Sequence, residues 1–297
     1  PSLLQTEMGT RGLDGKEGTM KLNQQGNNGG YRPNDPSGAA DDTYYVQAVN
    51  ATPVRVYNKT TGAVVTTFTM GNLWSPVTGN MGDPIVMYDR FADRWFLAQF
   101  GQSGGQNKIY IAISTTSDPT GSYYTYTFTS TQFPDYLKFS IWHDGYYMTC
   151  NTGTKRVLCF ERAAMLTGSP TARSVTQTFT AQTGGGFFCP LPADADGNGG
   201  LPTSGALPVF YYTDNAWGGG AVDGIRRHDV SVVWSATPTM TITAGSTLAT
   251  NAFDASYDSG WDDIAQPGTT QKLDGIGGVL TYRAQWRKWS TYNSVVL

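Results

Sequence analysis

The sequence predicts an all-β fold, a β-propeller with five four-stranded blades. Three stretches, beginning at Asp42, Asp93 and Asp144, each place an aspartate shortly ahead of two aromatic residues and a β-forming run, and they recur at an interval of 51 residues. A repeat of about 40 to 50 residues is typical of one propeller blade. Composition agrees, since 36 Gly, 15 Pro and 13% aromatic residues suit many short strands joined by tight turns.

The strands can be assigned in chain order. Residues 1–40 are rich in Gly, Asn and Gln and are expected to form a leader or linker, and residues 41–297 are expected to form one propeller domain. Apolar alternation predicts three strands of the first blade, at 44–50, 54–58 and 64–70. The second blade has all four of its strands, at 84–89, 95–100, 108–114 and 123–129.

The remaining units follow the same plan with growing irregularity. The third blade is expected at 137–142, 146–151, 156–161 and 174–180, with one helical turn at 162–166. The fourth is expected at 187–191, 207–214, 225–233 and 240–243, and the fifth at 271–274, 279–283 and 294–297. The fifth blade would then lack its outer strand. Because an open ring exposes a pairing edge, residues 19–22 are predicted to close it, unless the protein continues beyond Leu297.

Charge and composition exclude several classes of function. The net charge of −3, without runs of like charge, gives no footprint for nucleic acid or an anionic membrane. No stretch reaches the ~18 apolar residues of a transmembrane helix. Glutamate and lysine are scarce relative to Thr, Ser, Asn and Gly, which suits an extracellular β protein. The odd set Cys150, Cys159 and Cys189 is predicted to be buried free thiols.

A ligand face is predicted where the loops that enter the innermost strands gather. The candidate ligand-binding residues on it are Trp74, Asp83, Asp135, Trp217, Trp261, Asp262 and Trp286. Exposed aromatics stack on sugar rings while carboxylates accept hydrogen bonds from hydroxyls, so this mixture suits a glycan. The alternative is that the tryptophans pack between blades, as tryptophan is usually buried. Trp217, followed by three glycines, fits that alternative least well.

One acidic loop is a candidate calcium site. In the segment Asp194-Ala-Asp-Gly-Asn-Gly199, the oxygens of Asp194, Asp196 and Asn198 occupy positions one, three and five of a calcium loop, with glycine at position six. Position twelve is Gly205 in place of the bidentate glutamate of an EF-hand. The alternative is an ordinary Asp/Asn/Gly turn. The segment Asp35-Pro-Ser-Gly38 is likewise expected to be a structural turn, similar to the Asp-box turns of sialidase-like propellers.

Catalytic signals are sparse. The two histidines, His143 and His228, lack metal-ligand spacing, and no serine sits in a nucleophile-elbow pattern. A carboxylate pair, as in glycosidases, is the remaining route. It would have to use aspartates, namely Asp83, Asp135, Asp262 or Asp263, because Glu161 is predicted to lie in a strand away from the axis.

Four motifs in order carry a resemblance to a known family. They are Gly82-Asp-Pro-Ile-Val-Met-Tyr-Asp with its continuation to Phe100, the run 113–124, Trp142-His-Asp-Gly-Tyr-Tyr-Met-Thr149, and Gln266-Pro-Gly-Thr-Thr-Gln-Lys-Leu-Asp274. From residue 36 to 297 the chain resembles a family of secreted bacterial propeller-like proteins of unassigned biochemical role. The resemblance implies export to the cell surface or medium, and it supplies no catalytic residue.

These observations lead to one main hypothesis about function. We expect a noncatalytic secreted or cell-surface propeller that binds a glycan or an extracellular protein through its loop-rich face, as an adhesin or as a subunit of an extracellular assembly. One alternative is a glycoside-active enzyme that uses aspartates on the same face, and another is a structural spacer. Axial carboxylates about 5 to 10 Å apart around an open pocket would favour the enzyme. A plugged axis and a flat aromatic rim would favour binding.

Overall fold

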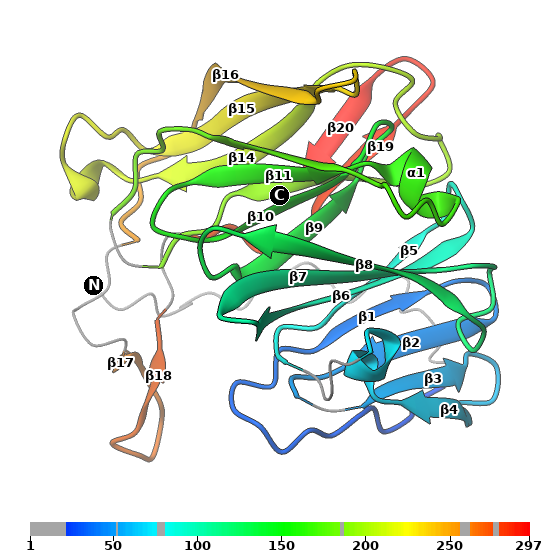
Figure 1. Cartoon of the computed structure of the whole chain (residues 1–297). Coiled ribbons are helices and arrows are strands. Elements are labelled where there is room, and N and C mark those ends of the chain that lie inside the picture. The colour runs from blue at the N-terminus through cyan, green and yellow to red at the C-terminus, as the bar shows by residue number, and fades with distance from the viewer. Residues whose placement is uncertain (1–21, 52, 76–80, 185–186, 256–261, 276–278) are drawn as a thin grey trace.

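The computed structural model describes residues 22–51, 53–75, 81–184, 187–255, 262–275 and 279–297. The chain forms consecutive antiparallel sheets that lie one after another across the molecule (Figure 1). The first sheet contains β1 (Ser37–Ala40), β2 (Tyr44–Ala48), β3 (Val54–Asn58) and β4 (Val64–Phe68). The second contains β5 (Ile85–Asp89), β6 (Arg94–Ser103), β7 (Gln106–Ser114) and β8 (Tyr123–Ser130).

The later sheets continue this order. The third contains β9 (Asp135–Ile141), β10 (Tyr146–Asn151), β11 (Arg156–Phe160) and β12 (Ser174–Thr178), with the short helix α1 (Arg162–Leu166) before β12. The fourth contains β13 (Leu191–Asp196), β14 (Leu207–Thr213), β15 (Gly224–Val233) and β16 (Thr239–Ala249). It is extended beyond β13 by β19 (Ala284–Lys288) and β20 (Asn293–Val296). The strands β17 (Asp262–Ala265) and β18 (Lys272–Asp274) form a separate pair.

The first strands of neighbouring sheets lie beside one another. β1 contacts β5, β5 contacts β9, and β9 contacts β13, while β13 pairs in parallel with β19. We refer to β1, β5, β9, β13 and β19 as the inner strands. Because the inner strands come together, the segments that precede them also meet at one end of the molecule.

The repeated aromatic pair explains how the sheets pack. Successive side chains of a strand point to opposite faces, so two adjacent aromatics serve two different interfaces. In β6, Trp95 is buried in the core between the first and second sheets, whereas Phe96 is buried in the core between the second and third. In β10, Tyr146 joins that second core and Tyr147 joins the core between the third and fourth sheets. The 51-residue repeat therefore marks the second strands of the first three sheets.

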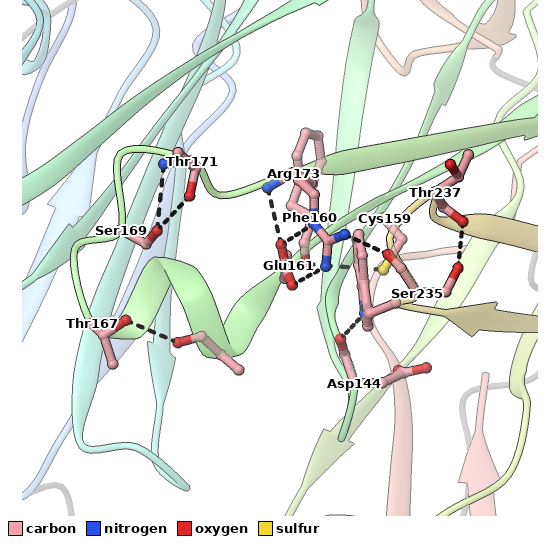
Figure 2. A network of polar contacts seen from close by, with 12 residues as sticks. Asp144, Cys159, Phe160, Glu161, Thr167, Ser169, Thr171, Arg173, Ser235 and Thr237 are labelled. Carbon is pink, nitrogen blue, oxygen red and sulfur yellow. Dashed lines mark hydrogen bonds and ion pairs between the residues drawn. The ribbon is translucent and has the colours of Figure 1, made fainter.

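Buried and half-buried ion pairs connect the sheets. Arg162 of α1 donates two hydrogen bonds to the fully buried Asp89 of β5, at 2.7 and 3.0 Å, and the Tyr146 hydroxyl donates a third at 2.7 Å. Figure 2 shows a second pair, in which Arg173 donates to both carboxylate oxygens of Glu161, and also to the backbone oxygen of Ser235 at 2.6 Å. The second pair links the third sheet to the turn between β15 and β16.

All three cysteines are free and buried, as predicted. Burial raises the pKa of the Cys150 thiol to about 12 and that of the Cys189 thiol to about 12, and it also raises the pKa of Cys159. The thiols are therefore held in the protonated, unreactive form at neutral pH.

The β fold is confirmed, but the predicted set of five four-stranded blades is not. Four sheets form as consecutive four-stranded units, whereas the last segment contributes only β19 and β20, which extend the fourth sheet. Residues 271–274, expected in the fifth blade, contribute β18 to the separate pair with β17. The reason lies in the free edge of β13, which pairs with β19 from Ala193 opposite Ala284 to Asp196 opposite Arg287.

Two further sequence predictions concern the N-terminal segment. The strand β1 lies within the stretch 1–40 that was expected to be a leader or linker, and it pairs with β2 from Ser37 opposite Ala48 to Ala40 opposite Tyr45. The predicted ring-closing strand at 19–22 falls on residues of which 19–21 lie outside the described ranges, and Leu22 is not in a strand.

Candidate functional site

A polar pocket of about 500 Å³ lies where three inner strands begin, and we call it the inner-strand pocket. It is lined by residues just before and at the start of β1 and β5, by residues at the start of β9, and by residues just before and within β19. The charged and aromatic side chains in its wall are those of Asp35, Asp83, Tyr136, Lys138, Tyr282 and Arg283. Its volume lies within the range of about 300 to 1,000 Å³ that is usual for small-molecule sites.

The pocket forms where a similar backbone conformation recurs at the starts of three inner strands. Asp35-Pro36 precedes β1 and Asp83-Pro84 precedes β5, and both aspartates adopt positive φ, 33° and 43°. Aspartate tolerates this region better than most residues because its short polar side chain hydrogen-bonds locally. At the start of β9, Tyr136 has a φ of 55°. The three entries therefore bend in the same way, and they bring their side chains to one place.

Amide donors hold three carboxylates at these entries. The backbone N–H of Tyr136 donates to Asp83 at 2.9 Å. The side-chain amide of Asn50 donates to Asp35 at 3.1 Å. The side-chain amide of Asn151 donates to Asp135 at 3.2 Å, next to the pocket. Each carboxylate is thus oriented by one neutral donor, which leaves further acceptor capacity on its oxygens.

The pocket shifts the acidity of its groups. Burial, with a smaller contribution from the neighbouring carboxylates of Asp35 and Asp135, raises the pKa of Asp83 to about 6 against the lowering effects of the hydrogen bond from Tyr136 and the charge of Lys138. Burial also raises the pKa of Asp35, and it lowers the pKa of Lys138. Asp83 therefore changes between a proton donor and an anionic acceptor in mildly acidic solution.

Aromatic rings and a second cation complete the wall. The Lys138 ammonium lies 3.2 Å from the centroid of the Tyr136 ring and 5.6 Å from that of Tyr282, in cation–π contact. The Tyr282 hydroxyl donates to the backbone oxygen of Phe139 at 3.2 Å. Arg283 forms an ion pair with the fully buried Asp194. The wall thus offers hydrogen-bond acceptors, two cations and aromatic surface within one concave site.

The predicted calcium ligands have cationic partners. Asp194 lies on β13, and besides Arg283 it accepts a hydrogen bond from the Ile141 backbone N–H at 2.8 Å. Asp196, at the end of β13, lies 3.3 Å from an Arg287 nitrogen and 3.6 Å from an Arg90 nitrogen. Arg90 also donates to the Asn198 side-chain oxygen, at 3.4 Å.

Arginines therefore occupy the oxygens that a cation would need, and among the described residues no group of three acidic, histidine or cysteine side chains could hold a metal ion. The contacts at this segment do not support a calcium site, because the first two acidic positions continue a buried strand and do not begin a loop, and calcium binding here stays a prediction.

Two of the predicted ligand-binding tryptophans belong to the core. Trp74 is buried, and its indole N–H contacts the backbone oxygens of Ile111 and Tyr126 at 3.3 and 3.1 Å. Trp286 is buried on β19, where its ring meets that of Trp142 edge to face with centroids 5.1 Å apart. For both residues the alternative of packing between sheets is correct.

Trp217 does not line the inner-strand pocket. Trp217, in a short 3₁₀ turn (Asn215–Trp217), is half-buried, and its ring centroid lies 5.2 Å from that of Tyr212. A Cβ atom at Gly184 would lie 2.6 Å from the Trp217 indole nitrogen, so that the glycine permits this packing. Trp261 lies outside the described residues. Asp262 begins β17 and pairs through its backbone with Asp274.

Of the predicted ligand-binding residues whose side chains the structure describes, it therefore brings together Asp83 in the pocket and Asp135 beside it. Sequence reasoning missed Asp35, Lys138 and Arg283. The repeated Asp-Pro dipeptide ahead of β1 and β5 is the signal that could have identified Asp35.

Comparisons with known proteins give little similarity. No family model matches the chain, and no curated protein matches it either. Among solved structures, a variant of the apocarotenoid oxygenase from Synechocystis is similar with a TM-score of 0.34 and 10% sequence identity, over 69% of this chain and 48% of that chain. The chain thus spans about half the length of that structure. Among the described residues, no helix combines the length and apolar character needed to cross a bilayer.

Proposed function

We propose that this chain is a secreted, propeller-like protein that binds a sugar in the inner-strand pocket. The observation that carries the proposal is the gathering of Asp35, Asp83 and Lys138 in one concave site of about 500 Å³. Sugar hydroxyls both donate and accept hydrogen bonds, so a site with fixed carboxylates and an ammonium matches them.

The chemistry of the wall favours a sugar over a flat protein surface. The site is concave and is lined by side chains from several sheets, which suits a single ring or a chain end. The rings of Tyr136 and Tyr282 supply apolar surface beside the polar groups. A flat aromatic rim is not supported, because Trp74 and Trp286, which were expected to contribute to it, are buried.

The proposal also includes the propeller-like arrangement of the sheets. Four sheets in chain order, with their first strands side by side, support a propeller-like ring in which β19 and β20 stand for an incomplete last blade. The polar, glutamate-poor composition and the resemblance to exported propeller-like proteins support secretion.

A glycan array with purified protein tests the proposal. Asp83→Asn and Lys138→Met remove charge from the pocket with little change of shape, and each is expected to weaken glycan binding at least about tenfold at neutral pH. Trp217→Ala is the matched control, since Trp217 lies outside the pocket lining, and it should leave binding unchanged. Binding that is lost only in Trp217→Ala would reject the pocket as the site. The absence of binding to any glycan would favour the spacer alternative.

A second candidate, a glycoside-active enzyme, is supported by the pKa of Asp83, which lies at about 6. A carboxyl group that keeps its proton in mildly acidic solution can protonate a leaving oxygen, while a second carboxylate such as Asp35 acts as base or nucleophile. Hydrolysis of a panel of aryl glycosides between about pH 4 and about pH 7 would test this. Hydrolytic activity that falls at least about a hundredfold in Asp83→Asn would support the enzyme. Glycan binding without any hydrolysis would support a noncatalytic binding protein.

A further inference from the structure

A second hollow, of about 830 Å³, lies at the opposite ends of the inner strands. Arg90 directly follows β5, Asp196 ends β13, and Arg287 and Lys288 end β19. Trp289 follows β19 and completes the wall. We call this site the basic hollow. It shares no lining residue with the inner-strand pocket.

The basic hollow carries an excess of positive charge on a chain whose net charge is −3. Its titratable side chains are those of Arg90, Arg287, Lys288 and Asp196, so three cations face a single carboxylate. The two guanidinium groups share Asp196, at 3.6 and 3.3 Å. Their side chains remain 41% and 42% exposed, which leaves them accessible to a ligand.

The arginines keep donors that the protein does not use. A guanidinium has five N–H donors. Arg287 donates from one terminal nitrogen to Asp196 at 3.3 Å and to Gln285 at 3.5 Å, and its Nε is buried without a partner among the described residues. Arginine binds the oxygens of carboxylate, sulfate and phosphate groups through paired N–H donors. The exposed terminal N–H groups of the arginines are therefore the donors that a bound oxyanion would use.

The backbone fixes the position of these cations. Gly197 has a φ of 77°, and the Arg287 side chain passes 3.5 Å from the place of its absent Cβ. A Cβ on Gly199 would lie 2.0 Å from the Lys288 backbone oxygen, so the glycine allows the loop after β13 to pack directly against β19. The basic hollow is thus built on two paired strands and a tightly packed loop.

An aromatic surface borders the cations. The rings of Trp289 and Tyr292 stack with centroids 6.0 Å apart, and the residues are 45% and 62% exposed. The Trp289 indole N–H donates to the Ser294 hydroxyl at 2.9 Å, which holds the ring in place. Exposed indole rings next to a charged site are suited to stacking on a sugar ring.

From this arrangement we propose that the basic hollow binds an acidic carbohydrate, with a sulfate or carboxylate group on the arginines and Lys288 and the sugar ring against Trp289. The segment predicted to hold a cation thus borders an anion site, with Asp196 orienting the two guanidinium groups. The proposal is independent of the sugar proposed for the inner-strand pocket, since the two sites lie at opposite ends of the strands.

Isothermal titration calorimetry at low salt tests the proposal with four probes: a sulfated disaccharide, its unsulfated form, glucuronic acid and inorganic sulfate. The wild-type protein should bind the sulfated disaccharide most tightly and the unsulfated form at least about tenfold more weakly, and the affinity should fall as salt is added. Equal affinity for the sulfated and unsulfated forms would overturn the proposal. Binding of inorganic sulfate as tight as that of the disaccharide would overturn the carbohydrate part.

Four variants locate the site. Lys288→Glu changes an exposed residue and should weaken binding of the sulfated disaccharide at least about tenfold. Lys272→Glu makes the same change at an exposed position in β18, outside the hollow, and should leave the affinity unchanged. Trp289→Ala should reduce affinity for the disaccharide more than affinity for inorganic sulfate. Asp83→Asn, in the inner-strand pocket, should have no effect.

The Asp196→Asn variant is expected to have the opposite effect on binding. Removal of the only carboxylate from the hollow should strengthen binding of the sulfated disaccharide several-fold, because two guanidinium groups lose their competing partner. Weaker anion binding in this variant, together with loss of calcium binding measured by the same method, would overturn the proposal in favour of a cation site. Unchanged melting temperatures of Lys288→Glu and Lys272→Glu would confirm that these two variants are folded.

Discussion

Replacement of Asp83 by Asn should change how the stability of the protein depends on pH. Asparagine preserves the shape of the side chain, retains an oxygen that accepts the Tyr136 N–H, and tolerates the φ of 43°. The substitution therefore removes the titration of one carboxyl group and leaves the local geometry in place.

The sign of the effect follows from the raised pKa. Burial raises the pKa of Asp83 from its ordinary value of 3.8 to about 6 in the folded protein, so that the folded state holds the proton more tightly than the unfolded state. The associated stability is present below about pH 4 and is lost as the pH rises through about 6. The difference between these pKa values corresponds to at most about 3 kcal/mol, and partial solvent access of Asp83 reduces it to about 1 to 3 kcal/mol.

Urea unfolding monitored by tryptophan fluorescence measures this effect. The free energy of unfolding of Asp83→Asn minus that of the wild type should rise by about 1 to 3 kcal/mol between about pH 4 and about pH 7. Asp42→Asn, at an exposed position, is the matched control and should show no such rise. A difference between Asp83→Asn and wild type that stays constant over this pH range would refute the assigned environment of Asp83.

Three further substitutions test the interior and one sheet-to-sheet contact. Arg162→Met should lower the free energy of unfolding by about 3 to 5 kcal/mol, because it leaves the buried Asp89 without its cation, and the double variant with Asp89→Asn should recover part of the loss in urea unfolding. Trp286→Ala should cost about 3 to 5 kcal/mol in the same assay through the cavity it leaves, and a loss below about 1 kcal/mol would contradict its burial. The pKa of Glu161 is lowered by hydrogen bonds from Arg173, so its stabilising effect is present above the ordinary pKa of glutamate and is lost as the pH falls through the folded-state value. In thermal unfolding, Glu161→Gln should therefore lower the melting temperature at neutral pH and have a smaller effect in acid, and an effect of equal size at both pH values would argue against the ion pair.

The local part of the fold could be predicted from the sequence. Apart from β1, the strands in the first three sheets follow from apolar alternation and from the aromatic pairs, because both signals arise within a few residues of the chain. The helix at 162–166 was predicted with the bounds that the structure shows. These segments could be predicted because the residues within each of them carry the pattern that identifies it as a strand or a helix.

The pairing of β13 with β19 could not be predicted in the same way. It joins Ala193 to Ala284 across 91 residues, and its register depends on which edge is free once the other sheets have formed. As a result, local patterns predict a loop at Asp194 and Asp196 and a ligand-binding role for Trp286. The structure places Gln285 to Lys288 on a strand, and Trp289 lies at the opposite end of the molecule from Asp83.

The candidate site was predicted in part for a related reason. The sequence points to Asp83 and Asp135 because they lie near the starts of predicted strands, and the structure brings such positions together. Lys138 could not be identified, since it lies within β9 and apolar alternation does not say what a polar residue on a strand faces. Trp74 and Trp286 are predicted to bind a ligand but are buried, because composition alone does not separate a binding tryptophan from a packing one.

The three buried thiols can be used to measure how often the interior of the protein opens. Cys150, Cys159 and Cys189 belong to different strands and loops of the third and fourth sheets, and none of them reaches solvent appreciably. An alkylating reagent can modify them only after these sheets separate, so the rate of modification measures how often the interior opens. The same enclosure keeps the three thiols from forming disulfides with other molecules once the chain has folded.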